Sequence, residues 1–317
     1  MELDDKTTDQ IAKLSEKFKN SGQDLNAYLD GLLYDRYLTY WDYIHLDTLL
    51  SLQNPKTHFP DELIFIGYHQ STEIYFKLIL HELKQIIDDR LQTAEFFRKK
   101  VERVNRYFRI LIDSFDVMIM GMERDQFLKF RMSLLPASGF QSAQFRMIEF
   151  HCTPLENLIH PDRRSKYSSE NSVEEMFENL YWKSGGIDMD TKEKTLTLKQ
   201  FEYRYTPRFI RTAKELLNNT LFHKYEQLDA SEKNNELLIK ELKKLDVNVN
   251  VNWLLMHMGA AHRYLRQEGK AVKATGGTNW KQFLPPSFQK VHFFPNLWSQ
   301  TEKENWGKEW VTHTFNT

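Results

Sequence analysis

The amino-acid sequence predicts an all-α fold, and its composition gives two reasons for this. Glycine and proline are scarce, at 12 and 9 residues among 317. Leu, Lys, Glu, Gln and Met are common, and these residues favour long helices over a sandwich or barrel. Hydrophobic residues make up 41% and charged residues 27%, so the chain can bury a sizeable core. No internal repeat is evident, and we expect a large single-domain helical bundle over residues 1–317.

Charge and cysteine usage exclude several kinds of function. The formal net charge is −1, which gives no basic field for nucleic acid. The one cysteine, Cys152, excludes an internal disulfide framework, a cysteine-ligated iron–sulfur cluster and a zinc site of several thiolates. Residues 1–10 are too polar for a secretory signal, and no apolar run approaches the ~18 residues that span a bilayer. We therefore expect a cytoplasmic protein without membrane or nucleic-acid partners.

The first expected helix covers residues 8–20, where Ile11, Leu14 and Phe18 recur at helical spacing opposite a polar face. In a monomer such a helix could lie loosely on the surface. A stripe this regular suits docking on a neighbouring subunit equally well. We expect docking for residues 1–23.

Aromatic residues crowd segment 24–52, and most of them are expected to pack between helices. Prolines then interrupt the chain, and a long helix is expected over 61–91. This helix is apolar around much of its girth, which predicts a place at the centre of the bundle. It contains His69, and this segment alone favours a core histidine bonded to a backbone carbonyl over a functional one. Another long helix is expected over 93–122.

Residues 123–150 are expected to form two helices separated by a bend at Pro136. The small residues that follow this proline allow a close approach of backbone to a flat ligand. Arg131 and Arg146 are each flanked by apolar residues. A buried arginine normally pairs with a carboxylate of the protein, which is the simpler interpretation for both. Either one could instead bind the carboxylate of a ligand through two parallel hydrogen bonds.

The later part of the chain alternates between polar and helical stretches. Residues 157–173 are rich in helix breakers and are expected to form a mobile loop. Residues 174–184 and 197–245 are expected to be helical, the second range as two helices. Residues 286–317, with their tryptophans and prolines, are expected to form an irregular C-terminal tail wrapped on the body.

Residues 253–277 hold the most informative chemistry. A helix with a broad apolar stripe carries His257 and His262, and the Thr-Gly-Gly turn that follows can bring N–H groups and a hydroxyl close to a small ligand. The two histidines lie about 140° apart round a helix, so at most one of them can bind a given metal. The Walker A, G-x-G-x-x-G, G-x-S-x-G and H-E-x-x-H motifs are all missing. A non-covalent haem with one axial histidine is a coherent possibility for an aromatic-rich bundle.

Four blocks of the sequence resemble the tryptophan 2,3-dioxygenase family in order and spacing. They are YWDYIHLDTLLSLQ (40–53), DELIFIGYHQSTEIYFK (61–77), FRMSLLPASGFQSAQFRMIE (130–149), and the W-x-x-x-H-x-x-x-x-H-R pattern of 253–263 with ATGG at 274–277. The PASGFQS-x-QFR match is highly specific. Together the blocks span most of residues 24–285, and beyond 285 little resemblance is seen.

The resemblance implies one haem b per subunit, ferrous in the active form, enclosed by a helical bundle. It also implies a homotetramer, as a dimer of dimers, with helices contributed across subunit interfaces. His257 would be the axial ligand of the haem iron, and the backbone at Ser138 and Gly139 would pass close to the haem. His69, the implied catalytic residue, would accept a hydrogen bond from the indole N–H as a positioning group rather than an obligatory base. The residues implied to bind the substrate are Phe65, His69, Phe127, Arg131, Leu134, Thr275, Tyr40 and Tyr43.

The reaction implied is insertion of both atoms of O₂ across the indole C2–C3 bond of L-tryptophan. It yields N-formyl-L-kynurenine, the first step of tryptophan catabolism by the kynurenine pathway. Arg131 would clamp the substrate carboxylate, and Thr275 would lie near its ammonium and carboxylate groups. Tyr40 and Tyr43 would reach the pocket from a neighbouring subunit.

Some residues depart from the family pattern. Leu254 stands where the family has arginine, Ala274 replaces the first glycine of the loop, and 278–280 replace Ser-Ser-Gly. The stretch between Arg263 and Thr275 is longer than in the family. These departures leave two alternatives: a haem-dependent aromatic amino acid monooxygenase, and a non-catalytic haem-binding protein of the same fold. The second needs no carboxylate clamp, so the retained arginine argues against it.

Overall fold

The computed structural model describes residues 3–35, 38–90, 93–134, 141–188, 191–267, 270–271 and 284–308. It divides into two compact units, unit 1 (Met1–Asn54) and unit 2 (Pro55–Thr317). Within the described residues the regular structure is helical except for a hairpin of β1 (Arg266–Gln267) and β2 (Lys270–Ala271). The predicted all-α class is therefore confirmed. None of the described helices is long and apolar enough to cross a membrane.

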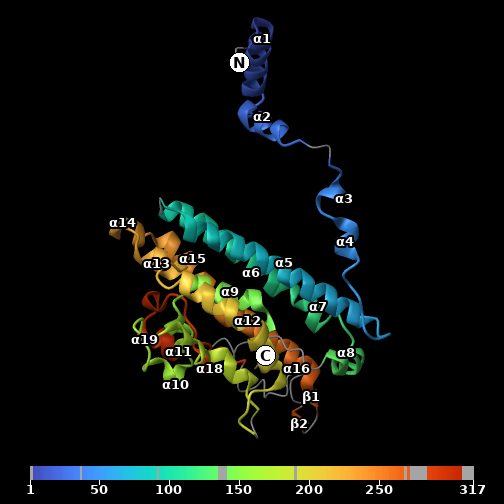
Figure 1. The fold of residues 1–317 in the computed structure, drawn as a ribbon, viewed down its shortest axis with the longest axis vertical. Coiled ribbons are helices and arrows are strands. Elements are labelled where there is room, and N and C mark those ends of the chain that lie inside the picture. Colours follow the sequence, from blue (N-terminus) through green and yellow to red (C-terminus); the bar gives the residue numbers. More distant parts are fainter. Residues whose placement is uncertain are drawn as a thin grey trace. The chain divides into compact units, whose positions relative to one another are not determined.

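Unit 1, in blue in Figure 1, is built of short helices. They are α1 (Asp5–Asn20), α2 (Leu25–Leu33), α3 (Tyr40–Tyr43) and α4 (Leu46–Leu50). The carboxylate of Asp4 caps α1 by accepting the N–H of Thr7 at 2.8 Å, and the helix ends at Ser21, so the helix predicted over 8–20 is confirmed. No described side chain of α1 or α2 is buried. The aromatic residues expected to pack between helices are largely exposed, as Tyr34 is at 81%.

Five described helices of unit 2 have twelve residues or more (Figure 1). These are α5 (Asp61–Asp88), α6 (Ala94–Ser114), α12 (Leu196–Glu215), α15 (Glu236–Val247) and α16 (Trp253–Leu265). The shorter α-helices are α7 (Asp116–Ile119), α8 (Arg124–Phe130), α9 (Ala143–Cys152), α10 (Pro161–Arg164), α11 (Val173–Phe177), α13 (Leu221–Glu226), α14 (Ala230–Lys233), α18 (Pro286–Gln289) and α19 (Gln300–Glu304). The remaining turns are the 3-10 helices η1 (Arg131–Leu134), η3 (Leu155–Leu158), η4 (Tyr181–Gly186) and η6 (Pro295–Leu297), and the π-helix η5 (Asn248–Asn252).

Several helix boundaries differ from those predicted. The single helix expected over 93–122 is divided into α6 and α7, because the chain breaks the helix at Phe115. The two helices expected over 197–245 are the four helices α12 to α15, separated by turns. The loop expected over 157–173 includes α10, and the tail expected over 286–317 includes α18, η6 and α19.

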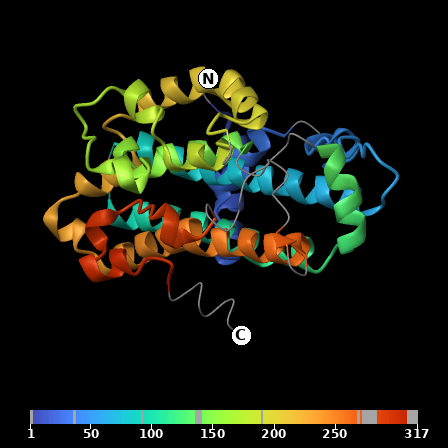
Figure 2. The same ribbon diagram turned by 90° about the horizontal axis from the view of Figure 1, so that it is seen from below.

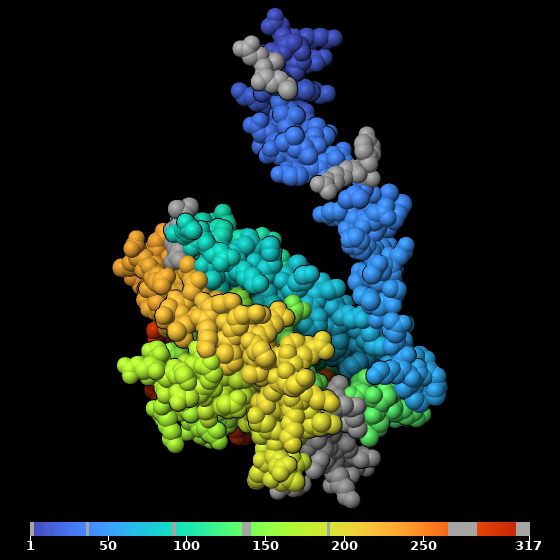
Figure 3. Space-filling model, viewed as in Figure 1, coloured from blue at the N-terminus to red at the C-terminus, as the bar shows by residue number. Residues whose placement is uncertain are grey.

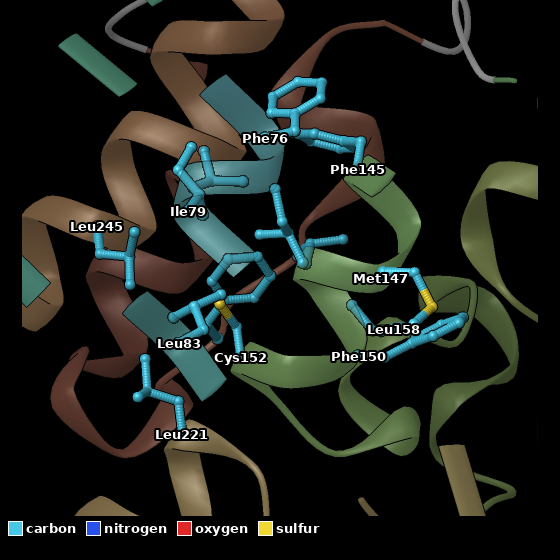
Figure 4. Close-up of a cluster of buried hydrophobic side chains, with 14 of the residues drawn as sticks. Phe76, Ile79, Leu83, Phe145, Met147, Phe150, Cys152, Leu158, Leu221 and Leu245 are labelled. Carbon is cyan, nitrogen blue, oxygen red and sulfur yellow. The ribbon is translucent and has the colours of Figure 1, made fainter. Parts of the chain in front are cut away.

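The core of unit 2 lies between α5 and α9. α5 packs along α6 and α9, and α6 packs along α15. Figure 4 shows Phe76 of α5 beside Phe145 of α9 and Leu83 of α5 beside Cys152 of α9, with Leu245 of α15 at the edge of the cluster. Ile79, Leu83 and Leu245 have no exposed surface at all. Burial of large side chains on this scale is the main favourable term in folding.

α5 is buried on one side only. Leu63, Ile74 and Leu78 are exposed by 49%, 47% and 40%. In the space-filling view, side chains of α5 form part of the visible face of unit 2 (Figure 3). The predicted central position therefore holds for the side that faces α6 and α9, and not for the whole girth. An exposed apolar stripe on a folded helix is a candidate contact with another chain.

Four helices that are distant in the sequence meet at one end of unit 2. Figures 1 and 2 both show α7, α8 and α16 gathered where α5 begins. α16 contacts α7 and α8, and α5 contacts the same two helices. This end brings together the predicted residues of α5, α8 and α16.

Candidate active site

His257 lies on α16 with its ring held in one orientation. Nδ1 is 2.9 Å from the backbone oxygen of Trp253, one turn earlier on the same helix. A carbonyl can only accept, so the proton is on Nδ1 and Nε2 carries a free lone pair. The edge-to-face rings of Phe115 and Trp253 each lie 4.7 Å from the imidazole centroid. Burial lowers the pKa of His257 to about 4, so the ring is neutral at pH 7.

His69 lies on α5 and is also neutral. Its Nδ1 is 2.7 Å from the backbone oxygen of Phe65, which again leaves Nε2 as an acceptor. Desolvation by the surrounding residues lowers the pKa of His69, although the residue keeps part of its surface exposed to solvent. The two histidines are close enough that His69 contributes to lowering the pKa of His257. His151 makes the same bond to a carbonyl one turn back, so this bond alone does not mark a functional histidine.

A wall of aromatic rings joins the two histidines. Tyr68 stands edge-on to His69 at 5.6 Å and to Phe115 at 5.7 Å, and Phe115 in turn contacts His257. On the other side of His69, the ring of Phe65 lies 4.1 Å from the imidazole and 6.3 Å from Phe127. These rings come from α5, α8 and the break between α6 and α7. They form an apolar surface suited to a flat aromatic ligand.

α8 is held in place by three contacts that the sequence did not predict. The carboxylate of Asp61, at the start of α5, accepts the N–H of Glu123 at 2.6 Å. The Asp61 N–H donates to the side-chain oxygen of Gln126 at 3.2 Å. The ring of Tyr264, at the end of α16, packs against that of Phe127 at 4.4 Å with the two planes tilted by 40°. Because these contacts tie α8 to both α5 and α16, they position Phe127 and the residues that follow it.

The two arginines singled out in the sequence differ in their surroundings. Arg146 bonds the carboxylate of Glu149 at 2.8 Å and the hydroxyl of Tyr181 at 3.0 Å, so the predicted structural ion pair is confirmed for this residue. Arg131 begins η1 directly after α8 and is 5% exposed. Burial lowers its pKa, yet an arginine remains a cation at neutral pH. A largely buried cation beside the aromatic wall suits a ligand carboxylate.

The other predicted site residues are distributed as follows. Leu134, half-buried, ends η1 and packs against the core of unit 2. Tyr40 and Tyr43 lie in unit 1 and are exposed by 70% and 73%. His262 is exposed on α16. The positions of Ser138, Gly139 and Thr275 lie outside the described residues.

Four aromatic residues of the site were not assigned a role from the sequence: Tyr68, Phe115, Trp253 and Tyr264. Trp253 had a usable signal, because a residue four positions before His257 shares its helical face. Phe115 had none, since a continuous helix was expected there. Among the described residues no group of three or more His, Cys, Asp or Glu side chains could hold a metal ion. The Nε2 lone pair of His257 is the kind of protein ligand that an axial haem site uses.

A helical bundle with a neutral, oriented histidine beside an aromatic wall has the elements that all-α proteins use to hold a planar metal cofactor by an axial ligand. The family model of tryptophan 2,3-dioxygenase matches residues 32–244 of the chain. A tryptophan 2,3-dioxygenase from Herpetosiphon aurantiacus is 31% identical over 265 residues, which cover 83% of this chain and 96% of that protein. The chain belongs to the tryptophan 2,3-dioxygenase family.

Shorter matches are more similar. Proteins of the same name from Ruegeria sp. and Bacillus thuringiensis are 40% identical over 141 residues and 42% identical over 117 residues. These matches cover 43% and 36% of this chain. The chain spans 48% and 40% of the length of these two curated relatives. The family model ends at residue 244, before α16, so its match does not include His257.

We predict that His257 stays neutral, with its proton on Nδ1, until the pH approaches 4. A folded pKa of about 4 lies below the ordinary value of 6.5, so the unfolded chain takes up the proton first as pH falls. The contribution of His257 to the free energy of unfolding therefore falls as the pH drops from 6.5 to about 4, and it does not change with pH above this range. The ¹⁵N shifts of the ring in histidine-labelled apoprotein report both the tautomer and the pKa. His257→Gln identifies the signal, and a titration centred near the ordinary value would contradict the prediction.

Proposed function

We propose that the chain is a haem-dependent dioxygenase that inserts both atoms of O₂ across the indole C2–C3 bond of L-tryptophan. The product is N-formyl-L-kynurenine. The proposal is carried by the pairing of two neutral histidines, His257 on α16 and His69 on α5, beside one aromatic wall. Membership of the tryptophan 2,3-dioxygenase family supports the same reaction.

The residues of α16 fit a haem held through one histidine. Nε2 of His257 is the donor atom that iron needs, and the bond from Nδ1 to the Trp253 carbonyl fixes the ring, as is usual for metal-binding histidines. Phe115 shields the imidazole from one side. Iron, when bound there in the ferrous state, supplies the site at which O₂ is activated. The backbone at Ser138 and Gly139 is proposed to pass close to the same haem.

L-Tryptophan is proposed to bind against α5 and α8. Phe65 and Phe127 offer rings to the indole, and Leu134 adds an aliphatic surface. Arg131, buried at the end of α8, would donate two parallel N–H bonds to the substrate carboxylate. Nε2 of His69 would accept the indole N–H. Since the Nδ1 proton of His69 is held by the Phe65 carbonyl, Nε2 faces the substrate as an acceptor, and we propose that this ring orients the indole.

We also propose a homotetramer, as a dimer of dimers, in which Tyr40 and Tyr43 of one subunit complete the site of another. Both tyrosines are largely exposed in unit 1. The exposed apolar side chains of α1 and α2 and the stripe on α5 support an assembly that covers them. Thr275 is proposed to contact the ammonium and carboxylate groups of the amino acid. A cytoplasmic location stays a prediction.

Turnover under ¹⁸O₂ tests the reaction. Haem-loaded protein is reduced without air and then given L-tryptophan with labelled O₂. We expect N-formyl-L-kynurenine that carries both labelled atoms, measured by mass spectrometry. A product with one labelled atom would indicate the monooxygenase instead. The departures from the family pattern in residues 264–280 are the reason for considering that alternative. No turnover of L-tryptophan, tyrosine or substituted indoles by protein with a normal haem spectrum would favour the non-catalytic haem-binding protein.

Arg131→Leu is expected to raise the KM for L-tryptophan by about 10- to 100-fold, because it removes a charge-assisted pair worth about 1.5–3 kcal/mol. Arg131→Lys keeps the charge but loses the planar guanidinium, so its KM for L-tryptophan should lie between those of wild type and Arg131→Leu. Tryptamine, which has no carboxylate, is the matched control: its turnover should differ little between wild type and Arg131→Leu. Steady-state kinetics with L-tryptophan that are the same in both proteins would remove Arg131 from the clamp.

Ile11→Asp combined with Leu14→Asp is expected to weaken the tetramer, because it places charges on the apolar face of α1. Both residues are exposed, by 38% and 41%, so the subunit fold should survive. Lys13→Ser with Glu16→Ser alters the polar face of the same helix as a control. Sedimentation velocity at several concentrations measures the assembly. If both double variants sediment as wild type does, α1 has no part in docking.

A further inference from the structure

His257 is preceded by a π-helical turn. η5 joins α15 to α16, and within it the Trp253 N–H donates to the Asn248 carbonyl five residues back. A π-turn holds one residue more than an α-turn. Since each residue of a helix advances about 100° round the axis, loss of that extra residue would swing His257 by about that angle. The π-turn thus sets the side of α16 on which the imidazole lies relative to α15.

Side-chain bonds, more than helix propensity, hold this turn. Its sequence is Asn-Val-Asn-Val-Asn, and both residue types are weak helix formers. Asn248 donates to the side-chain oxygen of Asn105 on α6 at 3.1 Å, and Asn252 donates to the side-chain oxygen of Asn248 at 3.1 Å. Asn105 itself donates to the backbone oxygen of Glu241 at 2.9 Å. This polar ladder ties the π-turn to α6 and α15.

Asp246, just before the π-turn, is fully buried, and its carboxylate accepts four hydrogen bonds. Its Oδ1 accepts the N–H of Phe293 at 2.7 Å and the amide of Asn250 at 2.8 Å. Its Oδ2 accepts the N–H of Phe294 at 3.2 Å and the indole N–H of Trp298 at 2.8 Å. Burial raises the pKa of Asp246 to about 6, although all four of these bonds act to lower it. One carboxylate thereby joins the π-turn to residues that lie far along the chain.

Residues 284–308, which Asp246 holds through Phe293, Phe294 and Trp298, also cover part of α16. They contribute Trp306 to a small core of four buried side chains. Its members are Val251, Leu255, Met258 and Trp306, with Leu284 and Trp298 packed against them. Leu255 and Met258 lie about 160° and 100° round the helix from His257. The segment therefore supports α16 on a face other than the one that carries the imidazole.

We propose that Asp246 is a positioning residue for His257. By fastening residues 284–308 to the π-turn, it fixes the rotation of α16 about its axis and with it the direction of the imidazole. The link to iron rests on the proposed function, whereas the fastening is a property of the polypeptide alone. Bonds behind a metal ligand of this kind set its orientation and affect the affinity for the metal.

Asp246→Asn tests the proposal. Whichever oxygen becomes the amide nitrogen, two of the four acceptor bonds are lost. We expect haem to transfer to apomyoglobin about tenfold faster than from wild type. The iron–histidine stretching band in the Raman spectrum of the ferrous protein should shift. In the apoprotein, backbone amides of residues 250–257 should exchange hydrogen about tenfold faster.

Glu82→Gln is the matched control. Glu82 is a carboxylate of α5 that is 1% exposed and paired with Lys100 and Arg103. It lies about 20 Å along the helix from His69, so its loss should lower the melting temperature without altering the three readouts. Trp298→Phe removes one donor to Asp246, keeps an aromatic ring and should act in the same direction as Asp246→Asn. It serves as the test if Asp246→Asn does not fold.

The proposal is overturned if Asp246→Asn and Trp298→Phe match Glu82→Gln in haem transfer, Raman band and amide exchange. A wild-type protein that takes up no haem would defeat the proposed function and would remove the first two readouts. The exchange of residues 250–257 and the ¹⁵N shifts of the His257 ring in the apoprotein then decide the positioning role. Unchanged exchange and shifts in both Asp246→Asn and Trp298→Phe would reject it.

Discussion

The burial of one side of α5 against α6 and α9 is the packing constraint on which the rest of unit 2 depends. Phe76, Ile79 and Leu83 are removed from water there, and this packing sets the direction of a helix of 28 residues. The same helix, about 42 Å long, carries Phe65 and His69 at its other end. A displacement within the core therefore moves one wall of the site. Stability and the candidate site share one helix; α8 contacts α5, and α16 joins the site through its contacts with α7 and α8.

The two buried arginines lie on different elements, Arg146 on α9 and Arg131 at the start of η1. Arg146 lies among the rings of Phe145 and Trp182 and bonds Glu149, which satisfies the need of a buried cation for a carboxylate partner. Arg131 is as strongly shielded from water, but it lies at the end of α8, next to the rings of the candidate site. Identical side chains with apolar neighbours in the sequence thus differ by the element on which they lie. The sequence alone could not distinguish them.

The sequence predicted those elements that are determined by residues close to one another in the chain. The apolar spacing of α1, the presence of a long helix at α5 and the all-α class follow from composition and periodicity. The break at Phe115 and the π-turn before α16 carry no comparable signal. Asp246 obtains three of its four donors from residues 47 to 52 positions later, so its role is visible only in three dimensions. In the candidate site, the histidines could be recognised by motif, whereas Phe115 and Tyr264 enter through tertiary packing.

The position of residues 284–308 in the chain has a consequence for biosynthesis. Translation proceeds from the N-terminus, so α5, α6 and α16 leave the ribosome before this segment does. Until it emerges, Asp246 lacks the backbone and indole donors of Phe293, Phe294 and Trp298, and Leu255 and Met258 lack the cover of Trp306. A nascent chain can thus form the central helix pairs early but cannot secure the rotation of α16. Maturation of the histidine helix is a late event, completed only after these last described residues have been synthesised.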